Sequence, residues 1–278
     1  MTTAFVLSGG ASLGAVQVGM LLALAENDIT PDLIVGTSVG AVNGGWVASR
    51  PDPDGIGELA DVWRSLSRGD VFPTRPLVGL FGFLGQRPNL VPASGLRRLL
   101  TRHLRFSRLE DAPIPLHVVA TDVLSGHDVL VSSGPAVDAI AASSAIPALL
   151  PPVRIGGRDL MDGGVVNNTP ISHAVDLGAD VVYVLPTGYA CDLSAPPRGV
   201  MAMALHALTL AINQRLAADI TRFEGVVDLR VAPPLCPVQV SPIDFSQAAT
   251  LIDHAYRETV RWLKHPHHAG QAALLAPH

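Results

Sequence analysis

The stretch that most constrains the fold of this chain covers residues 33–43. It opens with Leu-Ile-Val, a short run of branched apolar residues that is typical of a buried strand. Residues 36–40, Gly-Thr-Ser-Val-Gly, follow as the Gly-x-Ser-x-Gly pattern of a nucleophile elbow, a sharp strand-to-helix turn that exposes a serine at a helix N-terminus. Gly36 and Gly40 suit that turn because a larger side chain at either position would collide with the neighbouring strand or helix. Ser38 is therefore a candidate nucleophile.

A second strand-to-helix unit opens the chain. Residues 4–8 predict a strand, residues 9–14 form a loop of sequence Gly-Gly-Ala-Ser-Leu-Gly, and residues 15–25 predict a largely buried helix. Two successive units of this kind predict an α/β fold with a parallel sheet and helices on its faces. In such sheets the functional site lies at the carboxyl ends of the strands, where both turns would meet.

The loop at 9–14 matches neither of two common phosphate-binding motifs. A dinucleotide fingerprint requires glycine at its third position, where Ala11 stands, and a P-loop requires lysine after its last glycine, where Ala15 follows Gly14. What remains is a loop of small residues whose N–H groups point out of a helix start and favour an anion. Beside a nucleophilic serine this loop would serve as an oxyanion hole; otherwise it is a tight turn without chemistry.

Length and charge limit the remaining possibilities. At 278 residues the chain can bury a large core, and without an internal repeat or a linker we expect one domain over residues 1–278. The net charge of −5 argues against a nucleic-acid partner, because phosphate binding needs a dense basic surface. Cys191 and Cys236 predict neither a disulfide framework nor a metal site. With no basic leader and no uninterrupted run of about 18 apolar residues, we expect a cytoplasmic protein.

Further elements follow from the periodicity of apolar residues. In the helix expected at 56–67, four side chains share one face: Leu59, Val62, Trp63 and Leu66. Other helices are expected from the cap Ser94 to about 104, and over 136–145, 170–177, 200–223 and 246–264. Strands are expected over 115–121, 128–132, 181–185 and 226–231, with a hairpin over 153–160 around Gly156-Gly157.

The least regular region contains an apolar segment, residues 77–84. Nearby glycines and prolines prevent a stable helix, yet the segment carries Leu77, Leu80, Phe81 and Phe83. It either covers the core or forms a mobile flap over a site for an apolar substrate. We favour the flap, and expect any peripheral contact with a membrane to be made through 77–84.

Asp162 is the best acidic partner for Ser38. Gly163 and Gly164 follow it, and they permit a tight turn and a close approach of the backbone to another element. Such a turn suits a carboxylate held at a loop tip, although Asp-Gly-Gly is also common in plain turns. A serine hydroxyl needs a base to become a nucleophile, and an oxyanion hole to stabilise the tetrahedral intermediate.

Taken together, the glycine loop at 9–14, the elbow at 36–40 and the Asp-Gly-Gly at 162–164 resemble the patatin-like phospholipases in order and spacing. Residues 142–147, Ala-Ser-Ser-Ala-Ile-Pro, look like the proline-containing block that precedes the aspartate in that family. The resemblance covers about residues 4–187 and implies a three-layer α/β fold, with helices on both faces of a mostly parallel central sheet. A C-terminal extension would cover about 188–265, and a loose tail 266–278.

The resemblance also implies a chemistry. Ser38 would be the nucleophile and Asp162 the proton acceptor of a Ser-Asp dyad without histidine. The oxyanion hole would use N–H groups of Gly9, Gly10 and Ala11, and the motifs would be supported by Gly14, Gly36, Gly40, Gly163 and Gly164. The implied reaction is hydrolysis of a lipid or other ester, of phospholipase A, lysophospholipase or esterase type, through an acyl-enzyme and without a metal or cofactor.

The first block departs from the family pattern at two positions. Ala11 replaces a glycine and Leu13 replaces an arginine. Alanine can still offer its N–H as long as the loop does not need a positive φ there. Loss of the arginine removes a positive charge near the site, which would lower activity or shift substrate preference.

Two other functions stay open. One is an α/β-hydrolase triad with His206 or His254 as base, but the elbow of that fold usually follows several strands and Ser38 follows two. The other is a non-catalytic lipid- or protein-binding module on the same fold. The departures at the first block allow it, whereas the presence of both Ser38 and Asp162 argues against it.

Overall fold

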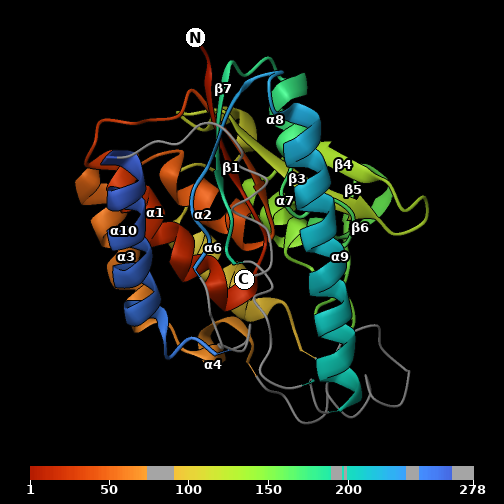
Figure 1. Cartoon of the computed structure of the whole chain (residues 1–278). Helices are drawn as coiled ribbons and strands as arrows, with labels where there is room; N and C mark the ends of the chain where they lie inside the picture. Colours follow the sequence, from red (N-terminus) through yellow and green to blue (C-terminus); the bar gives the residue numbers. More distant parts are fainter. Residues whose placement is uncertain (74–90, 189–195, 197–198, 236–243, 265–278) are drawn as a thin grey trace.

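The computed structural model of the chain describes residues 1–73, 91–188, 196, 199–235 and 244–264. Within these residues one eight-stranded sheet forms the centre of the molecule, in the order β5-β6-β3-β2-β1-β7-β8, with β4 paired to β3 off this path (Figure 1). The strands are β1 (Thr3–Leu7), β2 (Leu33–Thr37), β3 (Leu116–Asp122), β4 (Asp128–Val131), β5 (Val153–Ile155), β6 (Arg158–Asp162), β7 (Val181–Leu185) and β8 (Asp228–Val231).

The sheet is mainly parallel. The pairs β1–β2, β1–β7, β2–β3 and β7–β8 run parallel, whereas β4 and β6 run antiparallel to β3, and β5 runs antiparallel to β6. Every residue of β2 and β7 is buried, as expected of central strands that are covered on both faces. The α/β fold predicted from the two strand-to-helix units is confirmed.

Helices cover both faces of the sheet. The side chains of β1 alternate between the two faces and therefore contribute to two separate cores. Phe5 and Leu7 pack with the helices of one face, whereas Ala4 and Val6 pack with those of the other. Figure 1 shows the resulting layers, with α8 and α9 across the sheet from α1 and α10. The first face carries α1 (Gly14–Ala25), α2 (Val39–Val47), α3 (Pro53–Ser65), α4 (Arg68–Val71), α6 (Ser94–His103), α7 (Ala136–Ser143) and α10 (Ala248–Lys264), and the second carries α8 (Ile171–Asp176) and α9 (Val200–Phe223).

The predicted elements lie within three residues of the observed ones. The largest difference is at the helix expected from residue 56, which begins at Pro53. It begins earlier because the Asp52 carboxylate accepts a hydrogen bond from the Gly55 N–H at 2.9 Å, and because proline suits the first helical position. The expected cap Ser94 is instead the first residue of α6, and Ala93 precedes it without a side-chain cap.

Several predictions fall outside the described residues: the flap and membrane contact at 77–84, both cysteines, and the tail at 266–278. The single-domain organisation and the cytoplasmic location stay predictions. Of the helices that the structure describes, none combines the length and the apolar composition that crossing a membrane requires.

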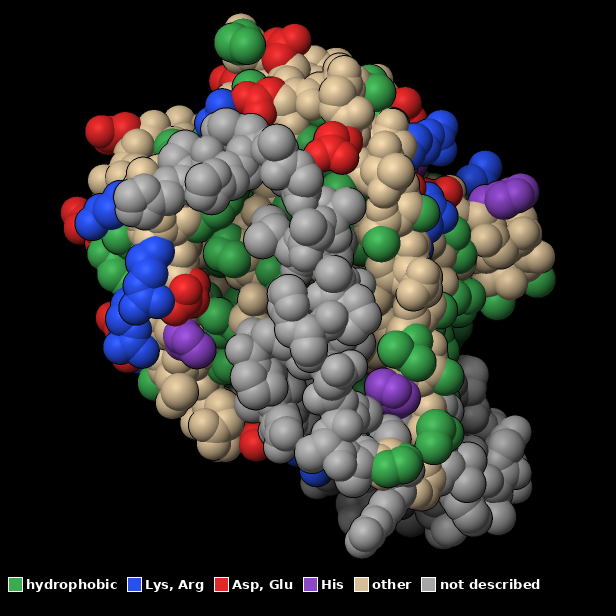
Figure 2. Space-filling model, in the orientation of Figure 1, with side chains coloured by type: hydrophobic (Ala, Val, Ile, Leu, Met, Phe, Trp, Pro, Cys, Tyr) green, Lys and Arg blue, Asp and Glu red, His purple; other side chains and the backbone are tan. Residues whose placement is uncertain are grey.

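Charged side chains of opposite sign lie next to each other along α10. Arg64 of α3 lies 3.6 Å from Asp253, and Arg261 pairs with Glu258. Figure 2 shows this mixture of basic and acidic side chains on the α10 side of the molecule. On the α9 side the same view shows exposed apolar side chains. Met203, Leu208 and Leu210 of α9 are exposed.

A buried polar network holds the helices of the first face together. The Asn43 amide of α2 donates to the Gly14 carbonyl and to the Gln17 side chain of α1, each at 3.0 Å, and accepts from the Trp63 Nε1–H of α3 at 3.0 Å. Gln17 in turn donates to the carbonyls of Ser8 and Leu185 at 2.9 Å. Three helices are thereby tied to the ends of β1 and β7.

We expect Asn43→Ala to lower the free energy of unfolding by about 2–4 kcal/mol, because it leaves buried donors and acceptors of two helices without partners. Urea unfolding measures this loss. The matched control is Asn27→Ala, which removes one hydrogen bond, to the Ala23 carbonyl, at the exposed end of α1. The control should lose less than about 1 kcal/mol. Equal losses in the two variants would contradict a stabilising role for the network.

Candidate active site

The nucleophile elbow is present at the end of β2. Ser38 joins β2 to α2 with φ 55° and ψ −122°, a backbone conformation that non-glycine residues rarely adopt. Its N–H donates to the Ser143 hydroxyl at 2.8 Å, and that hydroxyl donates to the Val119 carbonyl of β3 at 2.5 Å. Strain of this kind persists only where the surroundings hold the residue in place, and it clusters at functional sites.

The two glycines of the elbow allow its backbone to pass close to other backbone. A Cβ on Gly40 would lie 2.1 Å from the Leu7 carbonyl oxygen at the end of β1. A Cβ on Gly36 would lie 2.7 Å from the backbone of Gly40. The collision predicted for larger side chains at both positions is confirmed.

Asp162 lies beside the Ser38 side chain. The Ser38 hydroxyl donates to Asp162 Oδ2 at 2.7 Å, and the Gly164 N–H donates to Oδ1 at 2.8 Å. Asp162 is the last residue of β6 and pairs with Ala120 of β3, the strand next to β2. Gly163 permits this approach, since a Cβ there would lie 2.3 Å from the Val119 carbonyl oxygen.

Both side chains are shielded from water: 5% of Ser38 and 6% of Asp162 is exposed. Burial raises the pKa of the Asp162 carboxyl to about 6, against the lowering effect of the hydrogen bonds from Ser38 and Gly164. A carboxyl with this pKa exchanges a proton readily near neutral pH.

The glycine loop lies next to the serine. A Cβ on Gly9 would lie 3.1 Å from Ser38 Cβ. The Gly9 N–H is occupied, because it donates to the Asn168 carbonyl at 3.1 Å. Among the described residues, none accepts a hydrogen bond from the N–H of Gly10 or Ala11. Two of the three expected oxyanion-hole N–H groups are therefore available to a ligand.

From the sequence, alanine can stand in place of the family glycine as long as the loop needs no positive φ at position 11, and the structure does not meet this condition. The φ of Ala11 is 51°, in the left-handed region where alanine is strained and glycine is not. The loop thus takes the positive φ that the family glycine would allow. Leu13, at the place of the family arginine, packs partly buried against the core of the first face.

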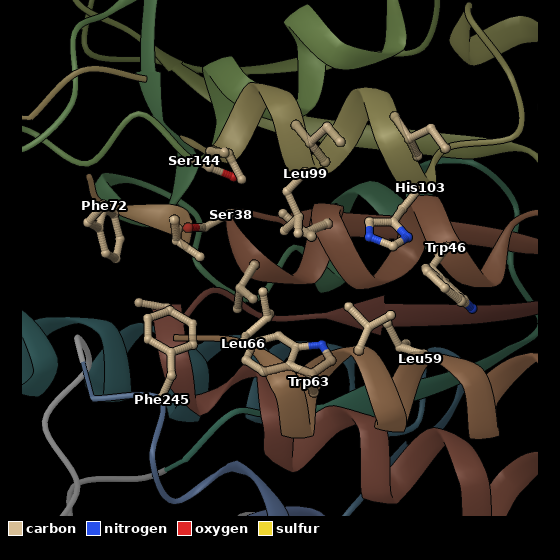
Figure 3. A pocket seen from close by; sticks show the side chains of 18 of the residues that line it. Ser38, Trp46, Leu59, Trp63, Leu66, Phe72, Leu99, His103, Ser144 and Phe245 are labelled. Atoms are coloured by element: carbon tan, nitrogen blue, oxygen red, sulfur yellow. The ribbon is translucent and has the colours of Figure 1, made fainter. Parts of the chain in front are cut away.

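Ser38 opens into an apolar cavity of about 810 Å³, its open mouth included. In Figure 3, Ser38 lies at one end of the cavity together with Phe72 and Phe245. Trp46 and His103 lie at the other end. Three helices form the walls of the cavity. The lining residues are Val39, Val42 and Trp46 of α2; Leu59, Val62 and Trp63 of α3, with Leu66 directly after that helix; and Leu96, Leu99, Leu100 and His103 of α6. The four residues predicted to share one face of a helix therefore line this cavity.

Sequence reasoning missed two serines of the site. Ser143 holds the elbow N–H, and Ser144 lies beside Ser38 in Figure 3, with a buried hydroxyl that has no partner among the described residues. Both lie in the block at 142–147, whose resemblance to the family was visible but whose individual roles were not.

The structure does not bring the candidate histidines to Ser38. His254 lies on α10, 3.7 Å from Glu258, and neither His254 nor His206 lines the cavity. In the part of the chain that the structure describes, no group of three or more His, Cys, Asp or Glu side chains is placed to hold a metal ion.

Comparison with known proteins identifies the family. The family model for patatin-like phospholipases matches residues 5–175. The chain is 30% identical over 191 residues to patatin-like phospholipase domain-containing protein 7 of Rattus norvegicus. The matched region covers 66% of this chain and 13% of that protein. The chain is also 30% identical over 195 residues to lysophospholipase NTE1 of Kluyveromyces lactis, covering 67% of this chain and 13% of that protein. The chain thus spans only a small part of the length of these relatives.

A solved structure has a similar fold. The structure of VipD from Legionella pneumophila superposes with a TM-score of 0.50 at 16% identity, covering 95% of this chain and 66% of that one. The family match extends over more than half of the chain, and includes the loop, the elbow and Asp162. This chain belongs to the patatin-like phospholipase family.

Proposed function

We propose that this protein is a serine-dependent lipid acyl hydrolase of phospholipase A, lysophospholipase or esterase type, with Ser38 as nucleophile and Asp162 as general base. One observation carries the proposal: the 2.7 Å hydrogen bond from Ser38 Oγ to Asp162 Oδ2, in a strained elbow that opens on an apolar cavity. The name of the Kluyveromyces lactis relative, a lysophospholipase, is in keeping with it.

Acylation would begin at this hydrogen bond. Ser38 Oγ attacks the ester carbonyl carbon while its proton passes to Asp162 Oδ2, and the carbonyl oxygen becomes an oxyanion. As the tetrahedral intermediate collapses, the bond from carbon to the leaving oxygen breaks and Asp162 returns the proton to the departing alcohol. A water molecule then repeats the sequence on the acyl-enzyme, and releases the fatty acid and the free serine.

Asp162 suits both halves of this cycle. With a pKa of about 6 its carboxyl is mostly ionised at neutral pH and can accept the serine proton, yet it is basic enough to hold that proton until the leaving group needs it. The Gly164 N–H fixes Oδ1 and leaves Oδ2 directed at the serine. A single carboxylate therefore serves as base and acid in turn.

The oxyanion would be held by the N–H groups of Gly10 and Ala11. Both N–H groups lack an acceptor among the described residues, and Ala11 lines the cavity together with Ser38. Because these donors are fixed by the backbone before the substrate binds, they stabilise the charge without reorganisation. The helix α1 begins at Gly14 directly after this loop, and its N-terminus also favours negative charge.

We expect Ser38→Ala and Asp162→Asn each to lower kcat on p-nitrophenyl esters by about three orders of magnitude or more, because each removes one half of the proton transfer. Circular dichroism and urea unfolding establish that the variants fold. Matched controls are Ser133→Ala and Asp176→Asn, two exposed positions that should retain wild-type rates.

A fluorophosphonate probe provides a second measurement on the same variants. It should label the wild type at Ser38 and leave Ser38→Ala unlabelled. A wild-type protein that neither turns over esters nor reacts with the probe would favour the binding module instead. Loss of activity in His206→Ala or His254→Ala, with the fold intact, would favour the triad.

We expect kcat/KM to rise with pH through an apparent pKa of about 6. The sign follows from the role of Asp162: the protonated carboxyl cannot accept the serine proton, so activity is lost as pH falls through this pKa. Rates with a p-nitrophenyl ester, followed at the isosbestic wavelength of nitrophenol between about pH 4.5 and 8, measure the profile. A rising limb near the ordinary aspartate value of about 4 would contradict the effect of burial on Asp162.

We expect Ala11→Gly to raise the free energy of unfolding by about 0.5–1 kcal/mol, because glycine relieves the strain of a positive φ. Ala148→Gly is the matched control for strain, since exposed Ala148 also has a positive φ of 65°. Both variants should gain stability in urea, and Ala11→Gly should retain or increase kcat because the N–H is unchanged. A loss of stability in Ala11→Gly alone would show that the Ala11 methyl contributes packing that outweighs the strain.

A further inference from the structure

We propose that the cavity holds a single acyl chain of about ten carbons, and that Trp46 and His103 form the wall that sets the longest chain it accepts. This inference rests on the proposed function, and it names a substrate class for it: esters with one medium-length acyl chain in the cavity and the alcohol portion outside.

The cavity extends along one side of α2. Ser38 precedes the first residue of this helix, and Val39, Val42 and Trp46 line the cavity at spacings of three and four residues, which place them on one helix face. Trp46 follows Ser38 by eight residues, so a rise of about 1.5 Å per residue separates the two positions by about 12 Å.

Two further helices form the walls of this groove. Leu59, Val62, Trp63 and Leu66 line it from α3 and the residue after it, again at spacings of three and four. Leu96, Leu99, Leu100 and His103 line it from α6 in the same pattern. Figure 3 shows the labelled side chains of these two walls directed toward a common space that extends from Ser38 to His103 and Trp46; they are Leu59, Trp63, Leu66, Leu99 and His103.

Among the described residues, the lining offers a hydrocarbon chain no free polar group along its middle. The indole N–H of Trp63 is used by Asn43, and that of Trp46 donates to the Gly55 carbonyl at 2.8 Å. The remaining polar lining residues are Ser38 and Ser144 at one end and His103 at the other. A charged head group would lose its hydration here without gaining partners, whereas each buried methylene is stabilised. The cavity therefore fits the acyl portion of an ester.

At the end opposite Ser38, the lining side chains are packed against one another. The rings of Trp46 and His103 lie 5.5 Å apart, the Arg50 guanidinium lies 4.0 Å from the Trp46 ring centroid, and Arg50 Nη2 donates to the His103 carbonyl at 3.0 Å. Trp46 and Arg50 are both buried. Burial, together with the charges of Arg102 and Arg50, lowers the pKa of His103, which favours the neutral imidazole.

The length of the groove sets the chain length. A carbon–carbon bond of about 1.5 Å at a near-tetrahedral angle advances an extended chain by about 1.25 Å, so about 12 Å holds about ten carbons. Longer chains would have to displace Trp46 or bend back, and either change opposes their binding.

The test is the acyl-chain profile of kcat/KM for p-nitrophenyl esters of four to sixteen carbons. We expect the wild type to peak at eight to twelve carbons. His103→Ala and Trp46→Leu enlarge the far end, and each should raise the ratio of the sixteen-carbon to the ten-carbon rate at least tenfold. Val42→Phe blocks the middle of the groove and should move the peak to six carbons or fewer. Trp262→Leu, at a tryptophan outside the cavity, should leave the peak unchanged.

The outcomes separate this inference from the proposed function. If the wild type is active but none of the cavity variants moves the peak, the chain-length assignment is overturned and the Ser38–Asp162 dyad stands. If the wild type is inactive and unlabelled by fluorophosphonate, the proposed function is overturned. The cavity can then be tested without catalysis, because Trp63 and Trp46 report on it by fluorescence.

For that measurement, Ser38→Ala is titrated with saturated fatty acids of six to sixteen carbons. Affinity that rises roughly fourfold per added carbon and levels off near ten carbons supports the inference. In Ser38→Ala combined with Trp46→Leu the plateau should move to longer chains. Affinity that keeps rising through sixteen carbons, or ignores the Trp46 substitution, overturns it.

Discussion

The contact on which the site depends is the approach of α2 to the end of β1. Because Gly40 has no side chain, its Cα passes so close to the Leu7 carbonyl that a Cβ there would lie 2.1 Å away. The helix can then start directly above the sheet, and the single residue left for the turn, Ser38, must take a positive φ. The positions of the serine, of the glycine loop after β1, and of the cavity along α2 all follow from this one turn.

The acid comes to the serine through the sheet and not through the local chain. β6 pairs antiparallel with β3, and β3 lies beside β2, so the end of β6 delivers Asp162 next to the end of β2. Thr121 anchors that end by donating to the Asp162 carbonyl at 3.0 Å, and Ser143 connects the elbow N–H to β3. The same enclosure that positions the carboxylate also removes it from water, which raises its pKa and disfavours its ionised form in the folded protein.

Under the proposed function, the packing of the helices would serve substrate binding as well as stability. Asn43 faces the buried network with Gln17 and Trp63, whereas Val42 and Trp46 of the same helix face the cavity. The polar network fixes the spacing of α1, α2 and α3. Apolar side chains on α2, α3 and α6 then leave a groove between helices that are already held apart.

The sequence by itself determined the local devices: the Gly-x-Ser-x-Gly turn, the glycine loop, the aspartate before two glycines, and the helix face of Leu59, Val62, Trp63 and Leu66. These depend on steric limits and on the 3.6-residue period, which short stretches encode. Only the tertiary structure decided that Ser38 and Asp162 meet across 124 residues of chain, and that the apolar face lines a cavity as well as packing in the core. It also decided that Ala11 has a positive φ. The Gly9 N–H is occupied because its acceptor, the Asn168 carbonyl, comes from a segment distant in the sequence. Distances between such segments depend on the strand order of the sheet, which local patterns do not contain.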